Sequence, residues 1–220
     1  QIRMKQESKV KLISSSSNDL LQDIAYMARV SNPSNQDNEE TAEKLLKYLI
    51  KHKHWSPFEM CSITLEINTT RDIAHQIVRH RSFAFQEFSQ RYAKPEDLGF
   101  PFKLRTGRLQ DVKNRQNSIE SNDRQLEMAW IQKQKSAIAT AESIYYWALE
   151  QGIAKEQARA ILPEGLTKTR LYMHGTVRSW MHYIDVRTTH GTQKEHMDVA
   201  RECAYVINPV FPMIKEFVHD

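Results

Sequence analysis

The apolar residues of this chain follow strand spacing in parts of its first third and helical spacing through most of the rest. Residues 62–69, with the sequence SITLEINT, place Ile63, Leu65 and Ile67 on one side of an extended chain, which is the clearest strand pattern present. Residues 9–14 predict another strand. Apolar residues at helical spacing predict helices over residues 20–28 and around residues 45–50.

The second half of the chain predicts helices over residues 126–149, 155–162, 171–186 and 192–207. Before them, from about residue 95 to residue 123, the chain is polar and has little periodicity. We expect an irregular excursion there, of the functional or mobile kind that long loops usually are. The predicted fold class is α+β: one helix-rich domain over residues 1–220 with a few strands.

Composition adds constraints to this picture. With 40% hydrophobic and 26% charged residues, the 220-residue chain is typical of a soluble globular domain. No run approaches the ~18 apolar residues of a membrane span, and the first residues show no apolar signal-peptide core, so we expect a cytoplasmic protein with no membrane partner. Cys61 and Cys203 lack disulfide or zinc spacing and predict buried thiols. The net charge of +4 weakly favours an anionic partner.

The densest candidate chemistry lies in residues 79–92, with the sequence RHRSFAFQEFSQRY. Arginine side chains bind phosphates or planar imides in a bidentate manner, and aromatic rings stack on heterocycles. The same composition suits an ion-paired surface helix followed by a core turn. A helix from about residue 71 would place Gln76, Arg79 and His80 on one polar face. Arg81 would then point to the apolar side, unless the helix ends before it or an anion compensates its charge.

The motif Arg79-His80-Arg81, followed by seven residues and Ser89, resembles the signature of the flavin-dependent thymidylate synthases, ThyX. Further blocks fit in order, with ARVS at residues 28–31 and HWSPFE at residues 54–59. The C-terminal half contributes matches at Ala158, Arg159, Leu162, Pro163, Arg178, Ser179, Trp180, Arg187, Gln193 and Glu195. The resemblance covers about residues 9–208. The QEFSQRY form and the GTQKEH run look most like viral members.

This resemblance implies a ThyX-like fold with a small, mainly antiparallel sheet, which assembles as a homotetramer with composite active sites. It implies FAD as the bound cofactor, dUMP as the substrate and dTMP as the product. Methylenetetrahydrofolate would donate the carbon, and NADPH would supply the reducing equivalents through the flavin. A family member that modifies dUMP differently, for example by hydroxymethylation, is an alternative.

The resemblance also implies roles for individual residues. Arg187 matches the arginine that stabilises the ionised uracil imide, and it is the predicted catalytic residue. The predicted FAD contacts are Ser56, Arg79, His80, Arg81, Glu87, Thr176, Val177, Arg178 and His182. The predicted dUMP contacts are Gln76, Arg79, Glu87, Phe88, Ser89, Gln90, Arg91, Arg159 and Arg187. We expect Ser89 to bind substrate rather than attack it, because a serine nucleophile needs an adjacent base and the sequence indicates none.

Three positions depart from the commonest pattern of the family. Thr176 and Gln86 stand where many members have asparagine, and Gly191 stands where histidine is frequent. The first two changes keep a polar side chain, but Gly191 does not, although His190 is adjacent. These departures leave the resemblance intact and put the individual flavin contacts at these positions in question.

Two other kinds of function are disfavoured by the sequence. The net basic charge and the arginines beside aromatic residues would suit a nucleic-acid-binding module. The chain contains no recognisable nucleic-acid fold, however, and glutamates balance its basic residues locally, so we expect no nucleic-acid partner. His52 and His54 form an HxH pair, but no carboxylate cluster or HExxH motif accompanies them, so we expect no metal site.

Overall fold

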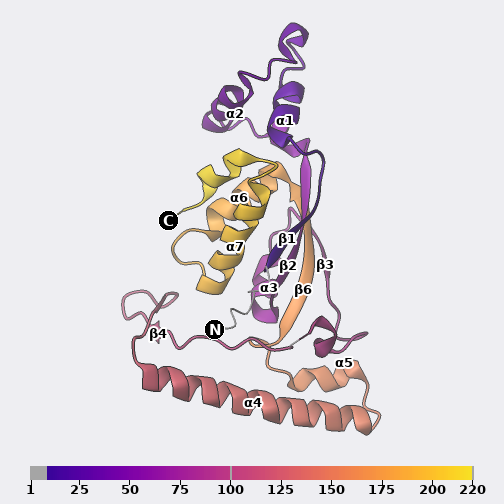
Figure 1. Ribbon diagram of the computed structural model, residues 1–220, viewed down its shortest axis with the longest axis vertical. Coiled ribbons are helices and arrows are strands. Elements are labelled where there is room, and N and C mark those ends of the chain that lie inside the picture. The colour runs from indigo at the N-terminus through magenta and orange to yellow at the C-terminus, as the bar shows by residue number, and fades with distance from the viewer. Residues whose placement is uncertain (1–8, 100, 220) are drawn as a thin grey trace, which may run out of the picture.

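A four-stranded antiparallel sheet forms the centre of the computed structural model, which describes residues 9–99 and 101–219 (Figure 1). Its strand order is β1-β2-β6-β3, so the strand that comes latest in the chain lies between two earlier ones. The strands are β1 (Val10–Ser15), β2 (Ser62–Thr70), β3 (Ala84–Glu87) and β6 (Lys168–Thr176). This arrangement confirms the predicted α+β fold with a small antiparallel sheet.

One face of the sheet is apolar and the other is polar, as the alternation in β2 predicts. Ile63, Leu65 and Ile67 are buried under α6 (Val177–Arg187) and α7 (Lys194–Ile207), which lie side by side on this face (Figure 1). Each fully buried side chain of this size contributes about 1.5–3 kcal/mol to the free energy of unfolding. A slip of one residue in the pairing of β2 would turn these apolar side chains to the other face, so the strand register determines which face α6 and α7 cover.

Cross-strand side-chain pairs organise the polar face between β2 and β6. Thr64 bonds to His174 Nδ1 (2.8 Å), and the Tyr172 hydroxyl lies 3.0 Å from a Glu66 carboxylate oxygen. Pairs of this kind stabilise neighbouring strands by about 0.2–1 kcal/mol each.

Two short helices and a 3-10 turn lie at the top of the molecule (Figure 1). These are α1 (Leu20–Ala28), α2 (Ala42–Lys51) and the turn η2 (Ser56–Glu59). A long loop joins the two helices. Asp19 caps α1, since its carboxylate accepts the backbone N–H of Gln22 (3.2 Å). The buried Arg29 of the ARVS block donates to the Asn38 carbonyl (2.6 Å), which fixes the intervening loop.

The lower part of the molecule has a core of its own. Helix α4 (Arg124–Glu150) runs across the bottom in Figure 1, and α5 (Lys155–Ala158) packs against it. Residues 95–123 are irregular, as predicted, but include the 3-10 turn η3 (Pro95–Leu98) and a two-stranded hairpin of β4 (Leu109–Gln110) and β5 (Ser118–Ile119). The side chains that share this second core are Phe102, Ile138, Tyr145, Ala148, Ala158 and Leu162.

Two expectations from the sequence were wrong at the central sheet and the helices next to it. The helix predicted over residues 171–186 begins only at Val177, because residues 168–176 form β6. The helix α3 (Arg71–Ile77) ends before Arg79, so the expected shared face of Gln76, Arg79 and His80 does not form as one helical stripe. Residues 168–176 are extended because they pair with β2 along their whole length and with β3 in part, and the local pattern does not reveal this pairing.

Among the described residues, no helix is both long and apolar enough to cross a membrane. Likewise, within residues 9–99 and 101–219, no group of three or more histidine, cysteine, aspartate or glutamate side chains could hold a metal ion. His52 and His54 instead lie at the end of α2, where their rings flank Tyr48.

Candidate functional site

The arginine motif forms a tight turn between α3 and β3. His80 N–H donates to the Ile77 carbonyl (3.1 Å), and Phe83 N–H donates to the His80 carbonyl (3.3 Å). Arg79 and Arg81 are exposed on either side, and neither makes an ion pair with a described residue. The turn therefore directs the histidine inward and leaves two arginines for an anionic ligand.

His80 and Arg187 are joined directly, although 107 positions separate them in the sequence. Arg187 Nε donates to His80 Nε2 (2.8 Å), and the His80 ring packs edge-to-face on Tyr183, with 4.9 Å between centroids. Burial, together with the charges of Arg187 and His182, lowers the pKa of His80 to about 4. The imidazole is therefore uncharged at neutral pH and can accept the bond from Arg187.

This pairing leaves the positive charge of Arg187 uncompensated. No carboxylate among the described residues forms an ion pair with it, and the bond to His80 uses only Nε. Its two terminal nitrogens can donate to a further acceptor. A half-buried arginine held by a neutral partner suits the stabilisation of developing negative charge.

A second group of predicted residues gathers where β6 meets α6. Thr176 caps α6 by accepting the backbone N–H of Ser179 (3.2 Å), and Val177 is buried in the core. Arg178 pairs with Glu59 (2.9 Å) of η2, the turn that begins at Ser56 and packs against α6. Threonine at position 176 thus supplies the helix cap that asparagine would also supply.

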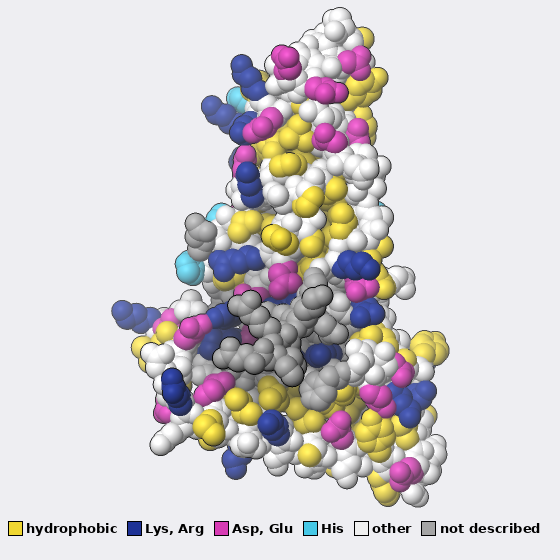
Figure 2. Space-filling model, viewed as in Figure 1, with side chains coloured by type: hydrophobic (Ala, Val, Ile, Leu, Met, Phe, Trp, Pro, Cys, Tyr) yellow, Lys and Arg dark blue, Asp and Glu magenta, His cyan; other side chains and the backbone are white. Residues whose placement is uncertain are grey.

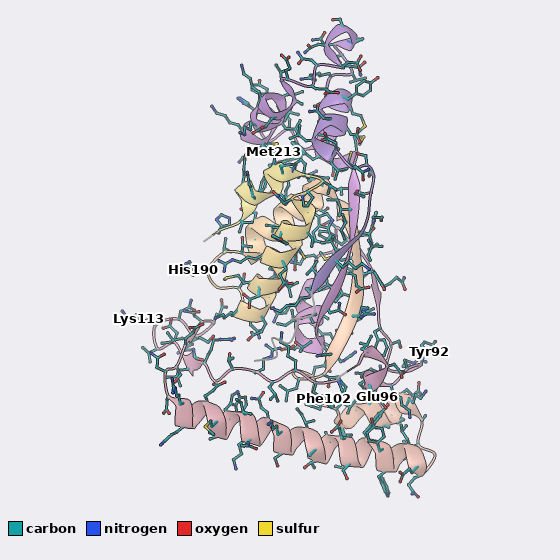
Figure 3. The ribbon with its side chains drawn as sticks, in the orientation of Figure 1. Tyr92, Glu96, Phe102, Lys113, His190 and Met213 are labelled. Atoms are coloured by element: carbon teal, nitrogen blue, oxygen red, sulfur yellow. The ribbon has the colours of Figure 1, made fainter. Side chains whose placement is uncertain are left out.

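The third group follows β3, near the opposite end of β6. Glu87 accepts a hydrogen bond from Thr169 Oγ1 (3.0 Å), and Phe88 N–H continues the pairing by donating to the Arg170 carbonyl (2.8 Å). The chain then turns at Ser89, whose carbonyl accepts the backbone N–H groups of residues 92 and 93. Tyr92 lies at the outer end of this turn (Figure 3).

The same turn faces α5 and the residues after it. Arg91 Nε lies 3.3 Å from a Glu156 carboxylate oxygen, and Arg159 Nε donates to the Glu156 carbonyl (3.3 Å). Arg91 and Arg159 therefore both contact Glu156, the first at its carboxylate and the second at its backbone carbonyl. The Ser89 hydroxyl accepts the Arg91 backbone N–H (3.4 Å), and no described histidine or carboxylate is bonded to it. A binding role for Ser89 fits this arrangement better than nucleophilic attack.

Gln90 is the predicted substrate residue with the least satisfied polar group. Its side chain is 3% exposed, yet its Nε2 donates to no described residue. An unpaired buried amide costs about 1–3 kcal/mol. The atom is itself enclosed, so a ligand can accept from it only if the turn shifts, and Gln90 marks this turn as a place where a polar partner is missing.

Gln76 bonds to Gln193, one of the positions that resemble the family, and to His196, for which the sequence predicted no role. Its Oε1 lies 3.1 Å from His196 Nδ1, and its Nε2 donates to Gln193 Oε1 (2.8 Å). His196 Nε2 lies 3.0 Å from the Tyr183 hydroxyl, and Gln193 Nε2 donates to Glu195 Oε2 (3.0 Å). One signal in the sequence could have found His196: it falls on the apolar stripe of α7, where a polar residue needs a partner.

Gly191 differs from the common histidine of the family for a backbone reason. Its φ of +96° lies in the left-handed region, which favours glycine. The adjacent His190 is exposed at the outer side of the loop between α6 and α7 (Figure 3).

A hollow lies at the end of the hydrogen bonds that run from Gln76 to Glu195. A cavity of about 520 Å³ is lined by the 95–123 excursion and the N-terminal ends of α4 and α7, including Arg105, Arg108 and Glu195. None of the predicted FAD or dUMP residues lines this cavity. The predicted residues instead occupy three separate places on one chain.

Residues 11–213 match the family described as thymidylate synthase complementing protein. The chain belongs to this family. A probable flavin-dependent thymidylate synthase of Paramecium bursaria Chlorella virus 1 is 52% identical over 191 residues, which cover 87% of each chain. The flavin-dependent thymidylate synthase of Synechocystis sp. is 49% identical over 87% of this chain and 86% of its own.

A solved structure of similar fold agrees with this relationship. The chain resembles a UMP/dUMP methylase, PolB from Streptomyces cacaoi, bound with 5-Br dUMP. The TM-score is 0.78 and the identity is 26%, over 94% of this chain and 93% of that one. Family membership and the viral-type resemblance predicted from the sequence are thereby confirmed.

Proposed function

We propose that this chain methylates dUMP to dTMP with a carbon from methylenetetrahydrofolate, using NADPH as the reductant through bound FAD. The family match and the relatives named above support this reaction. The observation that carries the proposal is the Arg187–His80 hydrogen bond (2.8 Å), which joins the arginine motif to the predicted catalytic arginine.

The donor groups around the motif fit an anionic dinucleotide such as FAD. Arg79 and Arg81 are exposed and free of ion pairs with described residues, and His182 lies close enough to His80 to lower its pKa. Arginine and histidine side chains bind pyrophosphate oxygens well. We assign FAD to Ser56, Arg79, His80, Arg81, Glu87, Thr176, Val177, Arg178 and His182. When bound, FAD supplies the hydride chemistry.

The turn after β3 fits a nucleotide monophosphate. Arg91 and Arg159 lie around Glu156, Ser89 offers a hydroxyl, and the buried Gln90 amide lacks an acceptor. We assign dUMP to Gln76, Arg79, Glu87, Phe88, Ser89, Gln90, Arg91, Arg159 and Arg187. Arg187 would hold a full positive charge against the uracil imide as negative charge develops there.

We further propose that the active enzyme is a homotetramer whose sites are composite. The flavin residues at the start of α6 and the nucleotide turn after β3 lie toward opposite ends of β6. Residues from a second copy would bring complementary groups together. The exposed face of α4 supports self-association, because Leu126, Trp130, Ile144 and Trp147 are each more than 40% exposed. Figure 2 shows hydrophobic side chains gathered over the lower part of the molecule, where α4 lies.

These four residues lie along one side of α4. Leu126 and Ile144 are 18 positions apart, which is five helical turns, and the tryptophans follow them by four and three positions. Trp130 and Ile144 each lie seven positions from Ala137. An antiparallel pair of α4 helices crossing at Ala137 would therefore set Trp130 of one copy against Ile144 of the other, as a twofold interface requires.

One experiment tests the reaction and its main alternative together. We expect purified protein to carry FAD or to take it up, and to oxidise NADPH faster when dUMP is present. Mass spectrometry of the nucleotide product should give dTMP; 5-hydroxymethyl-dUMP would instead identify the hydroxymethylating alternative. Protein that gains no flavin on incubation with FAD contradicts the proposal.

A further inference from the structure

Four hydrogen bonds connect Tyr183 to Glu195 through the interior between α3, α6 and α7. The Tyr183 hydroxyl bonds to His196, His196 to Gln76, Gln76 to Gln193, and Gln193 to Glu195, at 3.0, 3.1, 2.8 and 3.0 Å. His196 is fully buried. The proposed function uses only Gln76 from this set, so the other members need an explanation of their own.

The donor and the acceptor in each of these four hydrogen bonds follow from the ionised state of Glu195, at one end of the network. Arg108 holds the Glu195 carboxylate with two bonds (2.6 and 2.9 Å), and these bonds, with those from Gln193 and nearby Arg105, lower its pKa to about 2 despite its burial. An ionised carboxylate only accepts, so Gln193 Nε2 donates to it. Gln193 then offers only its oxygen to Gln76, whose Nε2 must donate.

The same logic fixes the tautomer of His196. Since Gln76 Nε2 points to Gln193, its oxygen points to His196, so His196 Nδ1 must carry the hydrogen. His196 Nε2 then accepts from the Tyr183 hydroxyl. Burial, with the charge of Arg187, lowers the pKa of His196 to about 3, so the ring keeps one donor and one acceptor at neutral pH.

We propose that His196 is a positioning residue that locks the Gln76 carboxamide in one orientation and thereby presents its second amide N–H to dUMP. A free carboxamide can exchange its nitrogen and oxygen by a rotation of 180°. Here that rotation would set acceptor against acceptor at Gln193, and it would set donor against donor at His196 unless the ring and the Tyr183 hydroxyl both reversed their roles. The inference rests on the proposed function, in which Gln76 contacts dUMP, and adds the group that orients it.

A locked donor lowers the cost of binding, because it need not be ordered when the substrate arrives. The network also reaches the arginine of the site, since the Tyr183 ring packs on His80, which holds Arg187. His196 itself touches neither of the proposed ligands. Its loss should therefore weaken dUMP binding without removing FAD.

Two substitutions separate orientation from packing. In His196→Leu both hydrogen bonds are lost, and we expect the dissociation constant of dUMP, followed by the change in flavin absorbance, to rise about tenfold with little change in FAD content. In His196→Asn the side-chain amide can replace the Nδ1–H donor, and we expect most of the affinity to return. The KM for dUMP should change more than kcat in both.

Val199→Ala is the matched control, since Val199 is buried on the same helix and lies outside the network. It should lower the melting temperature and leave dUMP binding unchanged. If His196→Leu binds dUMP as the wild type does, or if all three variants lose affinity in proportion to melting temperature, the positioning role is wrong. Wild-type protein that neither binds dUMP nor forms a methylated product would overturn the proposed function itself.

One further measurement uses only the wild-type protein, so it tests the proposal even if a His196 variant does not fold. Nitrogen-15 NMR of labelled histidine in the wild-type protein should show His196 as the neutral tautomer protonated on Nδ1. The tautomer protonated on Nε2, or a charged ring at neutral pH, would contradict the locked orientation.

Discussion

At the scale of single residues, the partner of Arg187 decides what its charge can do. A carboxylate partner would neutralise the guanidinium, whereas His80 orients it and leaves its charge available. We therefore expect Arg187→Ala to lower kcat by about 10²–10³, the usual effect of removing a group that stabilises transition-state charge. FAD content should stay near that of the wild type.

The matched control for this variant is Arg201→Ala. Arg201 is an exposed arginine on α7 that donates to the His219 carbonyl (3.0 Å) and lies outside the assigned site. It should keep wild-type turnover. Loss of flavin from Arg187→Ala, with turnover restored by added FAD, would show that this arginine holds the cofactor rather than the developing charge.

One buried histidine, His196, and one half-buried histidine, His80, predict how the stability of the protein depends on pH. The pKa values of His80 and His196 are lowered from 6.5 to about 4 and about 3, so the unfolded chain binds more protons than the folded one below pH ~6.5. The contribution of the two neutral rings to the free energy of unfolding is complete above pH ~6.5. It is lost as the pH falls toward their pKa values in the folded protein. We expect the melting temperature to drop on the order of 5 °C or more from pH 7 to pH 4.5.

Differential scanning calorimetry of the wild type and of His80→Gln across this range checks the expectation. Glutamine can accept from Arg187 but does not titrate, so the variant should show a shallower fall. His190→Gln removes an exposed histidine without touching either hydrogen-bonded pair and serves as the control. Equal slopes for the wild type and His80→Gln would contradict the assigned cause.

At the scale of elements, strong periodicity predicted strands and helices correctly, whereas strands that depend on pairing with distant residues were missed. The alternation in residues 62–69 and the apolar spacing of residues 126–149 and 192–207 predicted β2, α4 and α7 correctly. The sequence did not reveal β3, a four-residue strand, because such a short segment becomes extended only by pairing with β6. It also did not reveal that residues 168–176 are a strand, although Leu171, Met173 and Gly175 alternate inward.

The candidate site shows the same division between what local patterns predict and what long-range packing determines. Residue types and motif spacing marked residues 79–92 as candidate chemistry, whereas Arg187 was predicted only from the resemblance to the family. The bond between His80 and Arg187 and the chain through His196 join positions about a hundred residues apart. Such contacts depend on the packing of α3 against α7, which no local pattern specifies.

Gly175 shows how closely one element depends on another. A Cβ at this position would lie 2.4 Å from a carbon of the Phe83 ring, which packs between β6 and Trp180. We expect Gly175→Ala to lower the free energy of unfolding by about 1–3 kcal/mol, because the buried ring would have to shift. Urea denaturation measures the change.

Gly165→Ala is the corresponding control. A Cβ there would meet only the Asp72 carboxylate, at 3.6 Å, which is ordinary contact. Its free energy of unfolding should change by less than that of Gly175→Ala. Similar values for the two variants would mean that the Phe83 ring adapts without cost.

At the scale of the whole molecule, the exposed apolar side of α4 predicts how copies associate. A charge at Trp130 or Ile144 would face the partner helix in the proposed antiparallel pair, where an unpaired charge is costly to bury. We expect the double variant Trp130→Glu and Ile144→Glu to sediment as a smaller species than the wild type. Activity should fall with assembly if the sites are composite.

Met128→Glu is the control on the same helix. Met128 is 66% exposed and lies on the opposite side of α4 from Ala137, so its charge would stay in solvent. It should assemble like the wild type. An unchanged sedimentation coefficient for the double variant would place the contacts between copies elsewhere.

The position of β6 between β2 and β3 has a consequence for the newly made chain. Synthesis completes β2 about 100 residues, and β3 about 80 residues, before β6 begins. Until residue 176 has emerged, the inner edge of β2 therefore has no neighbour and β3 has no sheet to join. An unpaired strand edge recruits other chains, and pairings this distant in sequence form slowly. The growing polypeptide thus carries an unpaired strand edge from residue 70 to residue 176, and a truncated product ending before β6 should depend on chaperones to stay in solution.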